Sequence, residues 1–145
     1  MTKKSTILII DDEKDIRESL SEILLDEGYD TFLAADANEA RKLIKQEINL
    51  DIILLDIWMP DCDGITLLKE LKNNQKLTQP IIMMSGHGTI DTAIEATKNG
   101  AFDFIEKPIS LHRVLKVLND AINESLDFNT LTIEYFKNNK DKNLF

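Results

Sequence analysis

Five residues that could bind or accept a phosphoryl group stand directly after short segments with the composition of β-strands: Asp11, Asp12, Asp56, Ser85 and Lys107. A carboxylate that ends an apolar segment is costly to bury unless a cation compensates its charge. Two carboxylates about 4 Å apart repel each other by about 4 kcal/mol at an effective dielectric constant of ~20. The side chains of the three aspartates offer oxygen atoms as ligands, which indicates a hard cation such as Mg²⁺.

Asp56 is the candidate nucleophile, because a carboxylate can form an aspartyl phosphate. Lys107 could neutralise the charge of the incoming phosphoryl group, and Ser85 could donate a hydrogen bond to it. The apolar run at residues 52–55 would then be a rigid strand that holds Asp56 at the floor of a pocket.

The residues that must position these groups alternate between two periodicities. Strand-like runs are expected at residues 7–10, 31–34, 52–55, 81–84 and 102–106. Apolar residues at helical spacing follow each run. They are Ile16, Leu20, Ile23 and Leu24; Ala37, Ala40, Leu43 and Ile44; Ile65, Leu68 and Leu71; Ile90, Ala93, Ile94 and Thr97; and Leu111, Leu115, Leu118 and Ile122. Gly28 and Asn99-Gly100 are plausible helix ends, Asp36 and Glu39 form a pair typical of a capping box, and Ser110 is a candidate cap.

This alternation predicts an α/β fold, a flavodoxin-like (βα)5 three-layer sandwich with helices on both faces of a parallel five-stranded sheet. The first, third and fourth runs are uniformly apolar, as central strands are, and the second and fifth are mixed, as edge strands are. The expected strand order is therefore 2-1-3-4-5. In such a sheet ligands bind beyond the carboxyl ends of the strands, where the five candidate residues should meet.

The composition limits the class of protein. The chain has 145 residues, enough for one domain, and its net charge of −9 disfavours direct binding to nucleic acid. A single cysteine, Cys62, permits no internal disulfide. The first residues are too short and too charged a segment for a signal peptide or membrane span, so a cytoplasmic location is expected.

Four motifs resemble the receiver domain of two-component response regulators. They are IIDDE at residues 9–13, LLDIWMPDCDG at 54–64, MMSGHG at 83–88 and FIEKP at 104–108. The likeness extends over about residues 5–124, and residues 85–108 are most similar to the nitrogen-regulatory NtrC/NtrX branch, closer to NtrX. We therefore expect a receiver domain at residues 1–125, followed at 126–145 by an extension of the last helix or a linker toward an absent output domain.

The resemblance implies specific roles. Asp12 and Asp56 would ligate Mg²⁺ directly, Asp11 through water, and Trp58 through its backbone carbonyl. Asp56 would accept the phosphoryl group from a sensor histidine kinase. Ser85 and Phe104 would be switch residues. The Lys107–Pro108 peptide bond would be cis.

The same resemblance implies partners. Phosphorylation would change the surface formed by the fourth helix, the fifth strand and the fifth helix, which could mediate a homodimer. Members of this branch continue into ATPase and DNA-binding output domains that control transcription. The chain would then be a signalling domain, with self-phosphoryl transfer and slow autodephosphorylation as its only reactions.

Two other classes of protein remain open from the residues alone. A haloacid-dehalogenase-like phosphatase also uses a strand-end aspartate with Mg²⁺, but it needs a second acid where this chain has Trp58. A flavodoxin-like cofactor binder shares the fold, but the acids that follow the first strand would repel a cofactor phosphate.

Overall fold

The computed structural model describes residues 5–46, 49–86 and 89–124. Five parallel strands form one sheet in the order β2-β1-β3-β4-β5, which confirms the predicted order. The strands are β1 (Thr6–Ile10), β2 (Asp30–Ala34), β3 (Ile52–Asp56), β4 (Ile81–Ser85) and β5 (Asp103–Glu106). The helices are α1 (Lys14–Asp26), α2 (Ala37–Lys45), α3 (Gly64–Lys69) with a π-helical turn η1 (Glu70–Asn74), and α4 (Ile90–Lys98). Residues 111–124 form a further helical segment, here the last helix.

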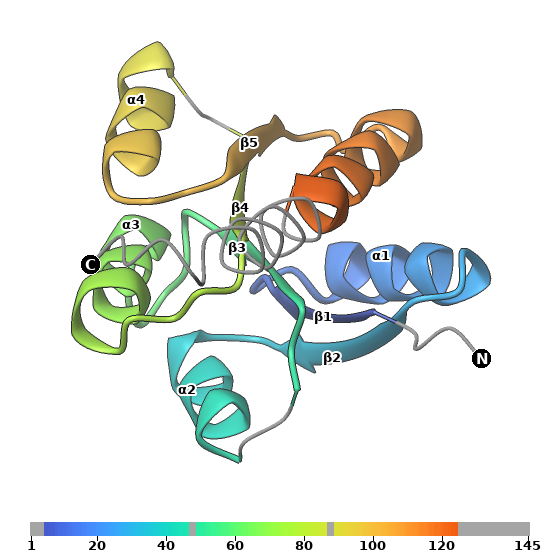
Figure 1. Cartoon of the computed structure of the whole chain (residues 1–145), viewed down its shortest axis with the longest axis horizontal. Coiled ribbons are helices and arrows are strands. Elements are labelled where there is room, and N and C mark those ends of the chain that lie inside the picture. The colour runs from blue at the N-terminus through green and yellow to red at the C-terminus, as the bar shows by residue number, and fades with distance from the viewer. Residues whose placement is uncertain (1–4, 47–48, 87–88, 125–145) are drawn as a thin grey trace, which may run out of the picture.

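Helices cover both faces of the sheet (Figure 1), and an apolar layer lies between the sheet and the helices on each face. Alternate residues of each central strand point to opposite faces, so Leu8 and Ile10 pack toward α2, α3 and α4, whereas Ile7 and Ile9 pack toward α1 and the last helix. β3 and β4 are buried along their whole lengths. This burial fixes the strands that carry the candidate site.

The register brings the predicted site residues to one edge. Ile10 pairs with Leu55, so the residues that follow them, Asp11 and Asp56, lie level with each other. β4 and β5 extend this edge, with Ser85 opposite Glu106. The carboxyl ends of four strands therefore meet where the sequence predicts a site.

The helix boundaries follow from identifiable caps. Asp36 accepts a hydrogen bond from the amide of Glu39, whose own carboxylate accepts one from the amide of Ala35. Ser110 Oγ accepts a hydrogen bond from the amide of Arg113 at 3.4 Å. Gly28 follows the end of α1 with a φ of 92°, a backbone conformation that glycine adopts without strain.

Two helical faces differ from the prediction. In α4, Ile90 and Ile94 are 81% and 47% exposed, whereas Ala96 is buried. α4 lies beside the edge strand β5, where less of the sheet is available to cover its apolar side chains. In the last helix the buried stripe is centred on Val114, Val117, Leu118 and Ala121, and the predicted Leu111 is 45% exposed. Because the apolar stripes of this helix overlap, the sequence alone did not determine which of its faces is buried.

None of the described helices is long and apolar enough to cross a membrane. The prediction for residues 126–145 lies outside the described residues.

Candidate functional site

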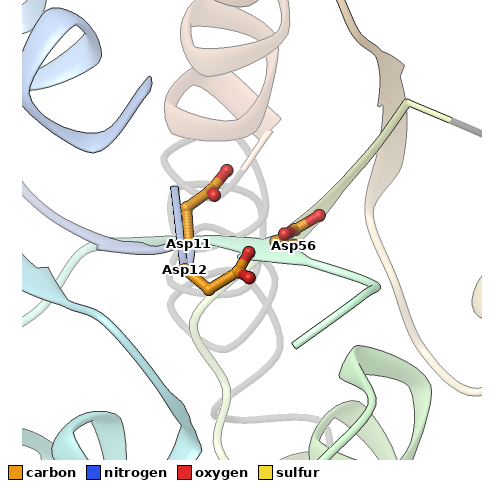
Figure 2. A group of neighbouring side chains, drawn as sticks. All are labelled: Asp11, Asp12 and Asp56. Atoms are coloured by element: carbon orange, nitrogen blue, oxygen red, sulfur yellow. The ribbon is translucent and has the colours of Figure 1, made fainter. Parts of the chain in front are cut away.

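Three carboxylates meet beyond the ends of β1 and β3. Each of Asp11, Asp12 and Asp56 offers an oxygen, and these oxygens lie within 4.8 Å of one another. Asp11 and Asp56 are buried, while Asp12 is exposed. Figure 2 shows the two side chains from the end of β1 beside that of Asp56. This arrangement could hold a metal ion with oxygen ligands.

Lys107 supplies the positive charge nearest to these acids. Its Nζ lies 2.8 Å from Oδ2 of Asp11, 3.4 Å from Oδ1 of Asp56 and 3.5 Å from Oε1 of Glu13. The Lys107 amide donates to the carbonyl of Ser85, and the Lys107–Pro108 peptide bond is cis, as predicted. Lys107 therefore joins the end of β5 to the carboxylates.

Burial and neighbouring charge shift the protonation of this cluster. Burial, together with the negative charge of Asp11, raises the pKa of Asp56 to about 7, although Lys107 opposes the shift. Burial alone would lower the pKa of Lys107, but its hydrogen bond and charge interactions with Asp11, and the charges of Asp56 and Glu13, raise it instead. The lysine is therefore cationic at neutral pH, and Asp56 is poised between its two forms.

Local hydrogen bonds fix Asp11 in place. Its Oδ1 accepts from the amide of Glu13 at 2.9 Å, and its carbonyl accepts from Nη1 of Arg17 at 2.8 Å. Its buried Oδ2 has the ion pair with Lys107 and no further partner among the described residues. Sequence reasoning missed Glu13 and Arg17, which follow Asp12 by one and by five residues.

The loop after β3 returns close to the backbone of Asp56. The Gly64 amide donates to the carbonyl of Ile57 at 2.6 Å. A Cβ at Gly64 would overlap the carbonyl oxygen of Asp56 and lie 2.8 Å from Cα of Ile57, so only glycine fits there. Sequence reasoning did not single out Gly64, although it directly follows Asp63, which caps α3. Trp58, within this loop, is 57% exposed.

The sequence that forms this site matches a known family. The family described as "Response regulator receiver domain" matches residues 7–119. The chain belongs to that family. The match favours the first of the three classes considered from the sequence, a receiver domain, over the phosphatase and the cofactor binder.

The relatives of this receiver domain include nitrogen regulators. The nitrogen assimilation regulatory protein NtrX of Azorhizobium caulinodans is 42% identical over 118 residues, which are 80% of this chain and 26% of that protein. The crystal structure of NtrX from Brucella abortus in complex with ADP is similar with a TM-score of 0.81 and 39% identity, over 90% of this chain and 30% of that one.

A solved receiver domain is similar over almost its whole length. The solution structure of the beryllofluoride-activated NtrC4 receiver domain dimer has a TM-score of 0.76 and 43% identity, over 82% of this chain and 97% of that one. By contrast, the chain spans about a quarter of the length of the curated full-length NtrX relatives it matches.

Two further residues predicted for the receiver site lie at β4 and β5. Ser85 is fully buried at the carboxyl end of β4. Phe104 is partly buried and packs against the apolar cluster beneath α2, α3 and α4, and its carbonyl accepts from the Arg113 guanidinium at 3.3 Å. Their roles as switch residues stay predictions, as does the role of the Trp58 carbonyl as a metal ligand.

Proposed function

We propose that this receiver domain accepts a phosphoryl group on Asp56 from a histidine kinase. The observation that carries the proposal is the convergence of Asp11, Asp12 and Asp56 with Lys107 at one edge of the sheet. A buried carboxylate with an ammonium 3.4 Å away can accept a group that carries its own negative charge once a cation held by the two neighbouring acids offsets their repulsion.

The donor atoms fit Mg²⁺. Three carboxylate oxygens lie within 4.8 Å of one another, and the buried Oδ2 of Asp11 can accept a further hydrogen bond, for example from a metal-bound water. Asp12 and Asp56 would bind the ion directly, Asp11 through water, and Trp58 through its carbonyl. When bound, Mg²⁺ neutralises the carboxylates and the phosphoryl oxygens.

The residues of the chain then perform the transfer. A carboxylate oxygen of ionised Asp56 attacks the phosphorus of a phosphohistidine, the P–O bond forms as the P–N bond breaks, and the electron pair leaves with the imidazole nitrogen. Lys107 compensates the phosphoryl charge, and Ser85 donates a hydrogen bond to a phosphoryl oxygen. Slow hydrolysis of the acyl phosphate returns the domain to its starting state, so it works as a signalling switch.

A groove beside the site offers a docking surface for the kinase. It has a volume of about 290 Å³ between α1 and the start of the last helix, and Lys107 contributes to its wall. The other lining residues are mainly apolar and include Ile16, Leu20, Ile109 and Leu111. A kinase bound in this groove would lie next to the ammonium that faces Asp56.

The output surface is proposed to be α4, β5 and the last helix. Movement of Ser85 toward the phosphoryl group and rotation of Phe104 would change its shape. Ile90 and Ile94 already expose apolar area on α4, which suits a homodimer. The related NtrC4 receiver domain is a dimer in its beryllofluoride-activated state.

The domain boundary and output are part of this proposal. Residues 1–125 would form the receiver domain, and residues 126–145 would lead toward ATPase and DNA-binding domains that control transcription. This arrangement is consistent with relatives about four times as long as the matched region.

Incubation with acetyl phosphate and Mg²⁺ tests the acceptor. The intact mass should rise by one phosphoryl group in the wild type, and Asp56→Asn should show no increase. Asp30→Asn, at the opposite end of the sheet, is the matched control and should be labelled normally. Equal labelling of the wild type and Asp56→Asn would refute the assignment of Asp56.

A further inference from the structure

The loop that follows Asp56 carries a carboxylate that closes the N-terminus of α2. Oδ1 of Asp61 accepts from the amide of Ala37, and Oδ2 of the same side chain accepts from the amide of Asn38, each at 3.2 Å. These residues are 24 and 23 positions away in the sequence. One carboxylate from the loop after β3 therefore binds two consecutive amides at the positive end of another helix.

The other amides of this helix end have different partners. The Glu39 amide donates to Oδ1 of Asp36, and the Ala40 amide donates to the carbonyl of Asp36. The helix's own cap thus serves the third amide, and Asp61 serves the first two. The two amides are bound by different oxygens, and asparagine at position 61 would put an NH2 donor in place of one of them, so in this geometry it would keep only one of the two bonds.

α2 is itself anchored on the side that faces this loop. Arg41 donates from Nε and Nη2 to both carboxylate oxygens of Glu70, at 2.9 and 3.0 Å. Its Nη2 also lies 3.8 Å from Sγ of Cys62, the residue after Asp61. The outer arm of the loop therefore rests on a helix that is fixed to η1.

The loop is held at two points, with the metal-binding segment between them. The bond from the Gly64 amide to the Ile57 carbonyl closes its base, and Asp61 binds its outer arm to α2. Trp58 lies between these points, two residues after Asp56. The two contacts restrain the chain on both sides of Trp58.

We propose that Asp61 is a positioning residue for phosphoryl transfer. By binding the N-terminus of α2, it fixes the loop so that the Trp58 carbonyl is presented to Mg²⁺ without rearrangement. Asp61 touches neither the ion nor the phosphoryl group in this scheme. The inference rests on the proposed function, because it concerns the metal site of that reaction.

The structure provides a matched control for this proposal. Asp36 and Asp61 both cap α2, but only Asp61 belongs to the loop. Asp36→Ala and Asp61→Ala should both destabilise the fold by weakening the same helix end. Mg²⁺ affinity separates the two roles, since a change in helix stability alone leaves it unaltered in the folded protein.

Mg²⁺ titration of Trp58 fluorescence is the primary measurement, because Trp58 is the single tryptophan of the chain. Asp61→Ala should raise the Mg²⁺ concentration at half-saturation about tenfold, the lower end for loss of a residue that orients a metal ligand. Asp36→Ala should leave it unchanged. At saturating Mg²⁺, labelling by acetyl phosphate should recover to the wild-type rate in both variants.

Equal Mg²⁺ affinities in Asp36→Ala and Asp61→Ala, with similar losses of melting temperature, would overturn the proposal. If Asp61→Ala does not fold, Asp61→Asn, which keeps the size of the side chain, takes its place with the same expected direction and the same overturning result. Failure of the wild type itself to be labelled on Asp56 would instead reject the proposed function.

Discussion

The two sides of the acidic site are built differently. On the side of α2 and η1, the ion pair between Arg41 and Glu70 is bidentate and about 70% buried on each partner. On the side of α4, the ion pair between Lys69 and Glu95 is 3.6 Å long, and both side chains are about half exposed. The α2 side is therefore held by directional, partly desolvated contacts, and the α4 side is not.

Apolar burial follows the same division. α2 buries Ala37 and Ala40, whereas Ala96 is the one buried residue among the described residues of α4. Segments that bury little apolar surface open or shift at low free-energy cost. We therefore expect the α2 side to preserve the geometry of the proposed metal site, and the α4 side to be the part that responds to the proposed phosphorylation.

The most damaging change to the fixed side should be Gly64→Ala. The added methyl group would overlap the carbonyl oxygen of Asp56, so the loop or the end of β3 must move. We expect a loss of about 3 kcal/mol or more in the free energy of unfolding, in the range of severe core substitutions, with loss of labelling by acetyl phosphate. Urea denaturation measures the first effect and intact mass the second.

Gly86→Ala is the control for this prediction. A Cβ at Gly86 would meet only Cβ of Lys107 at 3.8 Å, an ordinary contact. Its effect on the free energy of unfolding should stay within about 0.5 kcal/mol. Comparable losses in the two variants would remove the evidence that the loop is tightly fitted against Asp56.

Replacing the central acid should stabilise the fold. Because burial raises the pKa of Asp56 to about 7 from 3.8, the folded protein binds a proton more tightly than the unfolded chain. The wild type therefore loses stability as the pH rises from about 4 to about 7, and the loss persists at higher pH. Without Mg²⁺, Asp56→Asn should exceed the wild type by up to about 4 kcal/mol near pH 8 and match it near pH 4.

Thermal unfolding in a chelating buffer across this pH range measures the effect. Added Mg²⁺ should narrow the difference near pH 8, because it stabilises the ionised wild type. A pH-independent difference between Asp56→Asn and wild type would contradict the raised pKa. Asp30→Asn also replaces an acid by an uncharged residue but lies away from the cluster, so it controls for the loss of one acidic group.

Double-mutant cycles compare the two ion pairs directly. Alanine substitutions of Arg41 and Glu70 should give a coupling energy of about 1 kcal/mol, because the pair is bidentate and mostly buried. The same cycle on Lys69 and Glu95 should give about 0.3 kcal/mol. Equal coupling energies would mean that the α4 side is held as firmly as the α2 side.

The smallest effect on stability is expected at Ile90. Since its side chain is 81% exposed, Ile90→Ser should change the free energy of unfolding by less than about 0.5 kcal/mol. Its effect should instead be on association, with weaker dimerisation of the beryllofluoride-treated protein in light scattering. Leu25→Ser, half-exposed on α1, should leave association unchanged. Unaltered dimerisation of Ile90→Ser would exclude this part of α4 from the interface.

The strand order and the edge that gathers Asp11, Asp56 and Lys107 were predictable from the sequence. Central parallel strands are buried on both faces, so their uniform apolar character distinguishes them from edge strands, and residues after them must lie at the carboxyl edge. The contacts of Asp61 and Arg41 were not predictable, because they join segments more than 20 residues apart whose relative placement depends on tertiary packing. The exposed face of α4 was hidden for a similar reason, since helical periodicity does not reveal how much sheet is available to cover it.

The contact between Lys72 and Gly100 affects how α4 could tilt. Its ammonium donates to the carbonyls of Leu77 and Gln79, while its aliphatic stem lies under Gly100. Gly100, with a φ of 99°, follows the end of α4 and lies over the methylene groups of Lys72. Such an apolar contact has no preferred direction. A small rotation about this end of the helix would slide glycine over hydrocarbon and break none of the lysine's hydrogen bonds. The turn after α4 thus provides a point about which the helix could rotate with little resistance. A bulkier residue at position 100 would block that rotation.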